Sequence, residues 1–594
     1  DGKTYFCCYY SNDWSSHALL FCFFQKYEYF FGKCGVNHIF YVICLLNSFN
    51  FSHLVEIVTN MWHFCFIGDL IWNNNMDTEK KRFIDAVSAS YNPKGAYIQL
   101  GSGLLGDEII SDAKVNLALK IMNRHGLIAG ATGTGKTRTL QLMAEQLSDK
   151  GVPVLMLDVK GDLSGLAEKG SVNEALIERG ERVGIPFEPA QFPIEICSLS
   201  GNLGVPMRIT VQDFGPILLA RVLDLNDIQG GVLSAIFKYA GDQHWDLIDL
   251  QDLKKLLVYL SEGPGAAEIK RDYGKISTAT SGTILRKIVA LEQQGIAHIF
   301  GEKAFDIHDL FQKIDGRGGI TLLNISDIQD QTVVYSTFLL SLLDQLFAKL
   351  PEVGDLDKPK LVFFFDEAHL LFNGASKAFL NQVEQIIRLI RSKGIGVFFC
   401  TQAATDIPAS VLGQLGNRVQ HALRAFTPND VDNLRKTIKT YPFTPFYEID
   451  KVLTSLGTGQ ALITVLNEKG IPTEVVATHL VPARAVMGPC QAATYTEIIS
   501  NSELYGKYQE RLERRSAAEI VDEKMVAFET KQEQEKEKKE AEKTVKRSAG
   551  RRSSRQTPME AAKTQASRTL AREGAKLLGK LANGILNAMF KKNR

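Results

Sequence analysis

The chain has 594 residues, of which 45% are apolar and 23% are charged. This length exceeds one compact core and predicts two to four folded units, and the composition is that of an ordinary soluble protein rather than of a disordered or fibrous chain. The formal charge of +1 hides an uneven distribution, because residues 544–594 carry 13 Lys/Arg against two acidic residues.

Cysteine is also distributed unevenly along the chain. Six of the nine cysteines lie in the first 75 residues, and none of the nine forms a CxxC pair. The pattern therefore indicates neither a zinc site nor a disulfide framework, and we expect a cytoplasmic protein.

Residues 1–75 differ from the rest of the chain. They begin with Asp, no basic segment precedes a clean apolar run, and the best apolar run, residues 39–49, is well short of the roughly 20 residues that span a bilayer. An ordinary sequence begins at Met76. We interpret residues 1–75 as translated upstream sequence or the product of a misplaced start; the alternative is a genuine, poorly ordered extension, and no function is assigned to it.

From residue 76 the pattern predicts an α/β protein. A short α/β lead-in (76–124) is followed by strand, Gly-rich turn, helix and strand (125–206). Short apolar strands that alternate with helices indicate a doubly wound parallel sheet, and runs such as VFFF suit strands buried on both faces. Strands are predicted at residues 125–130, 152–159, 319–326, 360–367, 396–402 and 418–426.

Residues 207–311 show helical spacing instead of strand signals. Asp249 is a candidate helix cap before leucines at 253, 256, 257 and 260, and a similar pattern follows at Ile284, Ile288 and Leu291. We expect an all-helical insertion here, since roughly 100 residues greatly exceed a normal connection. The remaining predicted segments are the second part of the core (312–505), a charged helix or linker (506–558) and a C-terminal helix (559–594).

The most specific motif is GATGTGKT, residues 130–137. It matches the P-loop (Walker A) pattern in full and lies between a predicted strand and a predicted helix. Backbone N–H groups of such a loop surround phosphate oxygens, Lys136 neutralises the β- and γ-phosphates, and Thr137 is a ligand of Mg²⁺. The residues predicted to bind ATP are Gly130, Ala131, Thr132, Gly133, Thr134, Gly135, Lys136, Thr137 and Arg138. The alternative, a ligand-free Gly-rich turn, does not account for the motif and its context together.

A second motif, LVFFFDEAH, covers residues 361–369. A buried strand that ends in two carboxylates is typical of Walker B: Asp366 would hold Mg²⁺ through water, and Glu367 would orient or deprotonate the attacking water. The alternative is a strand end with solvated charges. The letters DEAH also occur in two-lobed helicases, but no second set of strands is evident here.

A third motif, CTQAATDIP (400–408), ends the next predicted strand. A polar side chain at this tip can contact the γ-phosphate and report hydrolysis. Gln402 is the candidate sensor and Thr401 the second choice, with a simple hydrogen-bonding role as the alternative.

Two further groups remain open at this point. Asp158 ends the strand after the P-loop helix and could position Mg²⁺ or Glu367, or could cap a turn. Arg388, Arg391, Arg418 and Arg424 are arginine-finger candidates, a role worth roughly 10³–10⁵ in rate when a neighbouring subunit supplies it. For each arginine a surface role is the alternative.

Together, GATGTGKT, the segment Asp158–Asp162, LVFFFDEAHLLF, RLIRSKGIGVFFCTQ and LGQLGNRVQHALRAFTP resemble the HerA-like bacterial ATPases, in particular a YjgR-type branch. The resemblance covers about residues 90–515. It implies a RecA-like core of the HerA/FtsK superfamily, a homo-oligomeric ring (usually a hexamer), and ATP-driven movement on double-stranded DNA.

The resemblance also implies roles for individual residues. Lys136 and Thr137 would be the P-loop pair, Asp366 and Glu367 the Walker B pair and Gln402 the sensor, and Arg391, in an Arg-x-Lys-Gly segment, would be the finger. One departure concerns the N-terminal β-barrel through which HerA docks a nuclease. Only about 50 residues separate Met76 from the P-loop, too few for that barrel, so a HerA-type nuclease partner is doubtful.

The predicted C-terminal helix has an apolar face (Leu570, Leu577, Leu578, Leu581, Ile585) among Lys and Arg. A basic amphipathic helix can bind a membrane surface, DNA or a partner subunit, or can dock on its own ring. Three functions therefore stay open: a DNA-translocating motor, an ATPase that remodels protein or acts at a membrane, and a nucleotide-gated scaffold.

Overall fold

The computed structural model describes residues 77–549, apart from residues 296, 355, 373–376, 425–426 and 513. The predictions for residues 1–75 and for the helix 559–594 lie outside these described residues. The chain divides into two compact units, Asp1–Ala86 and Val87–Arg594. A helix covers residues 77–91, and all elements considered below belong to the second unit.

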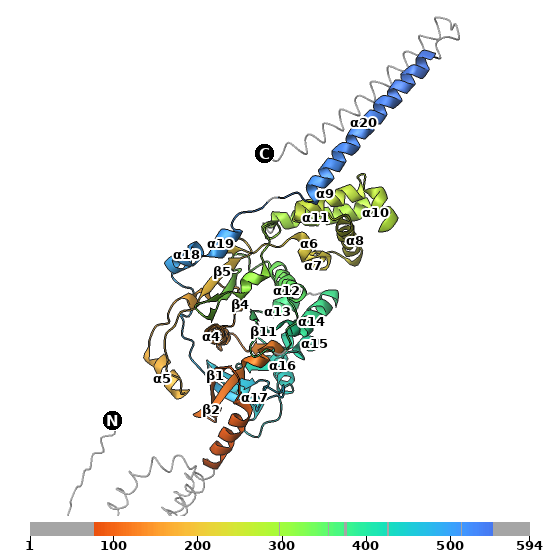
Figure 1. Ribbon diagram of the computed structural model, residues 1–594. Helices are drawn as coiled ribbons and strands as arrows, with labels where there is room; N and C mark the ends of the chain where they lie inside the picture. Colours follow the sequence, from red (N-terminus) through yellow and green to blue (C-terminus); the bar gives the residue numbers. More distant parts are fainter. Residues whose placement is uncertain are drawn as a thin grey trace, which may run out of the picture. The chain divides into compact units, whose positions relative to one another are not determined.

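A twelve-stranded sheet forms the centre of this unit (Figure 1). In spatial order its strands are β2 (Glu108–Ala118), β1 (Tyr97–Leu105), β14 (Val476–Leu480), β13 (Gln460–Thr464), β12 (Asn417–Gln420), β3 (Gly126–Ala129), β11 (Ile395–Thr401), β10 (Leu361–Phe365), β4 (Val154–Asp158), β9 (Ile320–Asn324), β5 (Ile194–Ser198) and β6 (Val205–Pro206). A separate hairpin pairs β7 (Lys313–Ile314) with β8 (Arg317–Gly318).

The eight strands from β12 to β6 are parallel, and they include all six strands predicted from the sequence. The other four strands, β13, β14, β1 and β2, extend the sheet antiparallel from β12. The lead-in strands β1 and β2 are thus joined to the P-loop sheet through β14. The sheet is therefore mixed, with a parallel centre of the RecA-like α/β type.

One predicted strand is too long. Residues 418–426 were expected to form a strand, but β12 ends at Gln420. Beyond it the backbone changes partners: the amide of Ala131 donates to Ala422 O at 2.9 Å, and the amide of Leu423 donates to Leu453 O at 2.9 Å. The chain leaves the sheet because these bonds join it to the P-loop and to helix α17 (Ile449–Ser455) instead.

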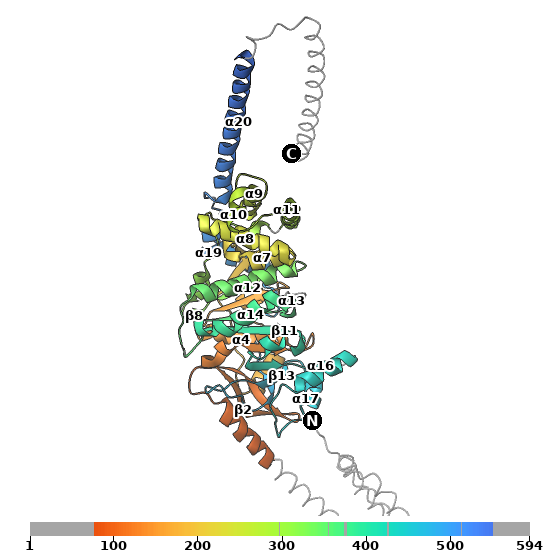
Figure 2. The ribbon, with the colours of Figure 1, turned by 90° about the vertical axis from the view of Figure 1, so that its right-hand side faces the viewer.

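Helices cover both faces of the parallel strands. Right-handed crossovers place α4 (Lys136–Asp149), which leads from β3 to β4, opposite to α12 (Thr332–Lys349) and α14 (Lys377–Ile390), which lead in the reverse direction to β10 and β11. Figures 1 and 2 show α12 and α14 together on one side of the strands. Strands β10 and β11 are buried along their whole length, as expected for strands packed on both faces.

Between β6 and β7 the described residues form helices. These are α6 (Val211–Phe214), α7 (Pro216–Val222), α8 (Asp227–Gln243), α9 (Leu250–Ser261), α10 (Ala266–Asp272), α11 (Thr278–Gln293) and the 3₁₀ turns Ala297–Ile299 and Ile307–Phe311. Asp249 caps α9 as predicted, since its side chain accepts from the amides of Gln251 and Asp252. The leucines that follow it are buried. The division into an insertion and two parts of a core remains a prediction.

The remaining helices complete the description. They are α5 (Glu174–Arg182), α13 (His369–Phe372), α15 (Ala409–Leu412), α16 (Pro428–Ile438), α18 (Ala492–Ser500), α19 (Glu503–Tyr508), α20 (Ala517–Ala549) and the 3₁₀ turns Leu119–Arg124, Ser164–Ala167, Arg391–Lys393 and Ala404–Asp406. Within the part of the chain that is described, no helix combines the length and apolarity needed to cross a bilayer.

Candidate active site

The predicted P-loop joins β3 to α4 at the carboxyl edge of the parallel strands. Its turns need glycine at two positions. Gly135 has φ 112°, a backbone conformation that side chains disfavour, and a Cβ at Gly130 would lie 2.5 Å from the Cβ of His421. The loop can curl this tightly against β12 only because these residues lack side chains.

The lysine of the motif lies over the loop. Lys136 Nζ donates to Gly130 O at 2.8 Å and to Ala131 O at 3.2 Å, and the Thr134 hydroxyl donates to Ala131 O at 2.7 Å. The ammonium is thus inside the curl, where phosphate oxygens can replace the carbonyls as acceptors. Thr132 and Gly133 at the loop's tip are exposed, and Thr137 is half-buried.

A buried histidine fastens the P-loop helix to the neighbouring strand. His421 Nε2 lies 2.9 Å from the hydroxyl of Thr139 on α4, and Nδ1 lies 3.0 Å from Gln460 O. Burial lowers the pKa of His421 from 6.5 to about 4. A neutral ring satisfies both contacts: Nδ1–H donates to the carbonyl, and Nε2 accepts from the hydroxyl.

We expect this histidine to make stability depend on pH. Because the folded pKa lies below the unfolded one, the unfolded chain binds more protons between pH 6.5 and 4, so the stabilisation is complete above pH 6.5 and is lost as pH falls toward 4. Between pH 7.5 and 5 the free energy of unfolding should fall by about 2 kcal/mol more in the wild type than in His421→Gln. Denaturant unfolding at both pH values measures this, and an equal fall in the two proteins would contradict it.

The loop before β13 also contacts the P-loop. The amide of Gly459 donates to Thr134 O at 3.2 Å. The guanidinium of Arg179, on α5, donates in turn to Gly459 O, and its Nε donates to Leu480 O at 3.0 Å. A side chain from α5 thereby fixes the loop that touches the phosphate-binding turn.

The predicted Walker B carboxylates follow β10, two strands from β3 in the sheet. Burial and then the charge of Glu367 raise the pKa of Asp366, while the charge of Lys136 acts in the opposite direction. Because β3, β11 and β10 are parallel neighbours, the P-loop lysine and both carboxylates lie at the same edge of the sheet. The amide of Glu367 donates to Asp366 Oδ1 at 2.9 Å.

Glu367 has an unusual backbone conformation and an unpaired side-chain oxygen atom. Its φ is 48°, in the left-handed region that non-glycine residues seldom adopt. Its Oε2 atom is buried without a hydrogen-bond partner, with His369 Nδ1 3.4 Å away. Strained backbone and unsatisfied polar atoms concentrate at functional sites.

The side chains at this edge fit ATP and Mg²⁺. Mg²⁺ is bound by one or two protein oxygens together with phosphate and water, and Thr137 and Asp366 are the donors that would hold it. Desolvation already disfavours the charge on Asp366, a cost that a cation would offset. Lys136 and the loop amides would hold the phosphates.

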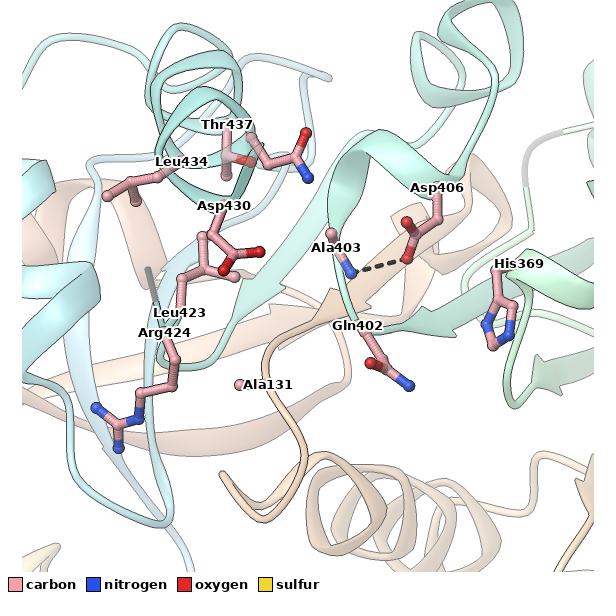
Figure 3. A pocket seen from close by; sticks show the side chains of 11 residues that line it. Ala131, His369, Gln402, Ala403, Asp406, Leu423, Arg424, Asp430, Leu434 and Thr437 are labelled. Carbon is pink, nitrogen blue, oxygen red and sulfur yellow. Dashed lines mark hydrogen bonds between the residues drawn. The ribbon is translucent and has the colours of Figure 1, made fainter. Parts of the chain in front are cut away.

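The two sensor candidates at the tip of β11 differ in their contacts. Thr401 is buried and its hydroxyl donates to Asp406 Oδ2 at 2.7 Å, so its hydrogen-bonding capacity is used within the turn. Gln402 is exposed. Figure 3 shows it beside a cavity of about 360 Å³ that also borders Ala131 of the P-loop and His369. Of the two, Gln402 is the one free to meet a ligand here.

Asp158 serves the turn that follows β4. Its carboxylate accepts from the amides of Gly161, Asp162 and Leu163 at 2.8–3.1 Å, and burial raises its pKa to about 6. Of the two roles considered for Asp158, this geometry matches turn capping.

The arginine candidates lie in different places. Arg418 donates to Thr440 O, and Arg424 donates to Thr454 O while lining the cavity beside the P-loop (Figure 3). Arg388 is exposed near the end of α14, and Arg391 follows it just before β11. Neither of the last two lies at the carboxyl edge where the P-loop is.

Sequence patterns missed several supports of the site, namely Arg179, His421 and Gly459. These residues lie from 42 to 322 positions after the end of the P-loop at Thr137, and no local motif marks them. The one available signal was the segment RVQHALRAF, in which His421 follows a predicted central strand.

Two curated relatives match about three fifths of the chain. Both are DNA double-strand break repair helicases HerA, from Sulfurisphaera tokodaii (22% identity over 377 residues) and Sulfolobus acidocaldarius (20% over 395 residues). The matches cover 61% and 63% of this chain and 66% and 68% of the relatives, so the chain spans just under two thirds of the first one. The YjgR-type branch remains a prediction.

Solved structures give distant likenesses. The unbound conjugative coupling protein TrwB matches with a TM-score of 0.41 and 13% identity, over 67% of this chain and 97% of that one. VirB4 of Thermoanaerobacter pseudethanolicus matches with a TM-score of 0.41 and 14% identity, over 66% and 98%.

The match to a family model is more extensive than these pairwise likenesses. The model of the helicase HerA-like C-terminal family covers residues 105–593, which include the P-loop and strands β10 and β11. The chain therefore belongs to the helicase HerA-like C-terminal family.

Proposed function

We propose that the protein hydrolyses ATP with Mg²⁺ at the carboxyl edge of its parallel strands. The observation that carries this proposal is the shared edge of the parallel strands, where the P-loop with Lys136 follows β3 and the carboxylates Asp366 and Glu367 follow β10. In this account Lys136 binds the β- and γ-phosphates, Thr137 and Asp366 hold Mg²⁺, and Glu367 orients and deprotonates the attacking water. Gln402 contacts the γ-phosphate.

We further propose that hydrolysis drives movement on double-stranded DNA by a homo-oligomeric ring, a hexamer. Membership of the HerA-like family supports this function, as do relatives named DNA double-strand break repair helicases. A HerA-type nuclease partner is not part of the proposal. Remodelling of protein, action at a membrane and a nucleotide-gated scaffold are the alternatives.

The position of Arg391 suits a finger that acts on a neighbouring subunit. Arg391 precedes β11, whereas Gln402 follows it. Seven strand residues at roughly 3.3 Å each separate the two ends by about 20 Å, more than an arginine side chain can reach. Arg391 therefore cannot serve the P-loop of its own chain, and in the proposed ring its role would be toward the P-loop of a neighbouring subunit.

Mixing two inactive variants tests this assignment. In a mixture of Arg391→Ala and Glu367→Gln subunits, some interfaces pair an intact Glu367 with an intact Arg391. We expect the mixture to hydrolyse ATP faster than either variant alone. Arg388→Ala, which removes an exposed arginine three residues away, should keep the wild-type rate. A mixture no faster than its components would contradict a finger supplied by the neighbour.

Steady-state ATP hydrolysis with and without linear duplex DNA tests the proposed function. We expect strong stimulation by the duplex that weakens as salt is raised, because phosphate contacts release counterions. Hydrolysis indifferent to DNA would contradict the motor and favour protein or membrane remodelling. Bound ATP without any hydrolysis would favour the gated scaffold.

A further inference from the structure

The first turn of α12 lies at the same edge of the sheet as the Walker B carboxylates. Strands β9, β4 and β10 are parallel neighbours, so their carboxyl ends share one edge. Helix α12 follows β9 and begins at Thr332, and it also contacts α13, which begins two residues after Glu367. Tyr335 belongs to this first turn.

Tyr335 carries a buried hydroxyl group without a partner. The residue is 1% exposed, and its OH makes no hydrogen bond. Burial, and then the charges of Glu367 and Asp366, raise the pKa of Tyr335 to about 12. The phenol therefore stays protonated near both carboxylates, as a donor that lacks an acceptor.

Glu367 has an unpaired hydrogen-bond acceptor, whereas Tyr335 has an unpaired donor. Its Oε2 atom is a buried acceptor without a hydrogen-bond partner, and His369 Nδ1 lies 3.4 Å from it. Buried polar atoms are normally paired. An unpaired donor and an unpaired acceptor in one electrostatic neighbourhood point to a bond that another state of the protein completes.

We propose that Tyr335 is a positioning residue for ATP hydrolysis, whose hydroxyl donates a hydrogen bond to the Glu367 carboxylate when Mg²⁺ and ATP are bound. The bond holds the carboxylate in the orientation that accepts a proton from the attacking water. This inference rests on the proposed hydrolysis and adds α12 to the elements that build the site.

Apolar packing alone does not explain why residue 335 carries a hydroxyl group. A phenylalanine would fill the same apolar volume without burying an unpaired polar group, and such a group destabilises a fold. A purely structural tyrosine would therefore be replaced by phenylalanine without loss of activity. A positioning tyrosine trades some stability for rate.

Tyr335→Phe tests the proposal in the full chain. We expect kcat to fall about tenfold to a hundredfold, the range for losing a hydrogen bond to a charged group, with KM for ATP unchanged and a melting temperature equal to or above that of the wild type. Tyr239→Phe is the matched control. Tyr239 is also buried, but its hydroxyl donates to Glu268 at 2.7 Å within the helical segment, so this variant should keep kcat and melt at a lower temperature.

The kcat and the melting temperature of Tyr335→Phe distinguish a positioning role from a structural one. An unchanged kcat in Tyr335→Phe overturns the inference, and so does a fall in kcat that accompanies a lower melting temperature, since that identifies a structural role. If the wild type binds ATP but does not hydrolyse it, the proposed function fails first. An active wild type with an equally active Tyr335→Phe leaves the proposed function intact and removes only the inference.

Discussion

Replacing Glu367 by Gln is expected to lower the rate of ATP hydrolysis by about 10²–10⁴-fold, the contribution typical of a general base. Gln keeps the size of the side chain but cannot accept a proton from water. ATP binding should persist, because the phosphates are held by the P-loop on β3 and α4 rather than by this residue. Phosphate release and the equilibrium affinity for ATP measure the two effects separately.

A matched variant controls for the change of charge. Glu262→Gln alters an exposed glutamate that follows α9 in the helical segment, and we expect it to leave the rate unchanged. If Glu367→Gln hydrolysed ATP at the wild-type rate, Glu367 could not be the base. If it lost ATP binding as well, its role would lie in the architecture of the site.

Replacing Lys136 by Ala is expected to weaken ATP binding by about 10–100-fold. The ammonium lies inside the P-loop, 2.8 Å from Gly130 O, and the variant would lose a charge-assisted hydrogen bond to phosphate worth ~1.5–3 kcal/mol. Isothermal titration with a non-hydrolysable ATP analogue measures the affinity.

The same helix offers the control for Lys136. Lys150 is exposed at the opposite end of α4, and Lys150→Ala removes an identical charge from it. This variant should bind ATP as the wild type does. Equal affinities of Lys136→Ala and Lys150→Ala would place the phosphates somewhere other than the predicted loop.

The parts of the site that lie in one short segment could be predicted from the sequence. The glycines and Lys136 fall within eight residues, and Asp366 and Glu367 directly follow a continuous apolar strand, so local spacing was enough to identify them. The central parallel strands could also be predicted from the sequence, because runs such as VFFF are typical of strands buried on both faces.

The parts of the site that were not predicted depend on contacts between segments that are distant in the sequence. His421 meets Thr139 across 282 positions, and Gly459 meets Thr134 only because β13 adds antiparallel to β12. Nothing in the local sequence shows which strand will be the neighbour of β12. The length of β12 was overestimated for the same reason, since its end is set by partners in the P-loop and α17.

The same limit explains why Tyr335 was missed. A tyrosine in an apolar helix is expected to be a core residue. Only the fold shows that the first turn of α12, which contains Tyr335, lies at the edge of the sheet where Glu367 lies. The reading of Asp158 needed the structure too, because only the geometry distinguishes a carboxylate that binds three amides from one that faces a metal.

The central claim, ATP-driven movement along duplex DNA, is tested most directly by displacement of a third strand bound at the far end of a linear duplex. We expect the full chain to release this strand only with ATP and Mg²⁺ present, and we expect Glu367→Gln not to release it. Rapid ATP hydrolysis on the same duplex without release of the third strand would contradict the claim of movement.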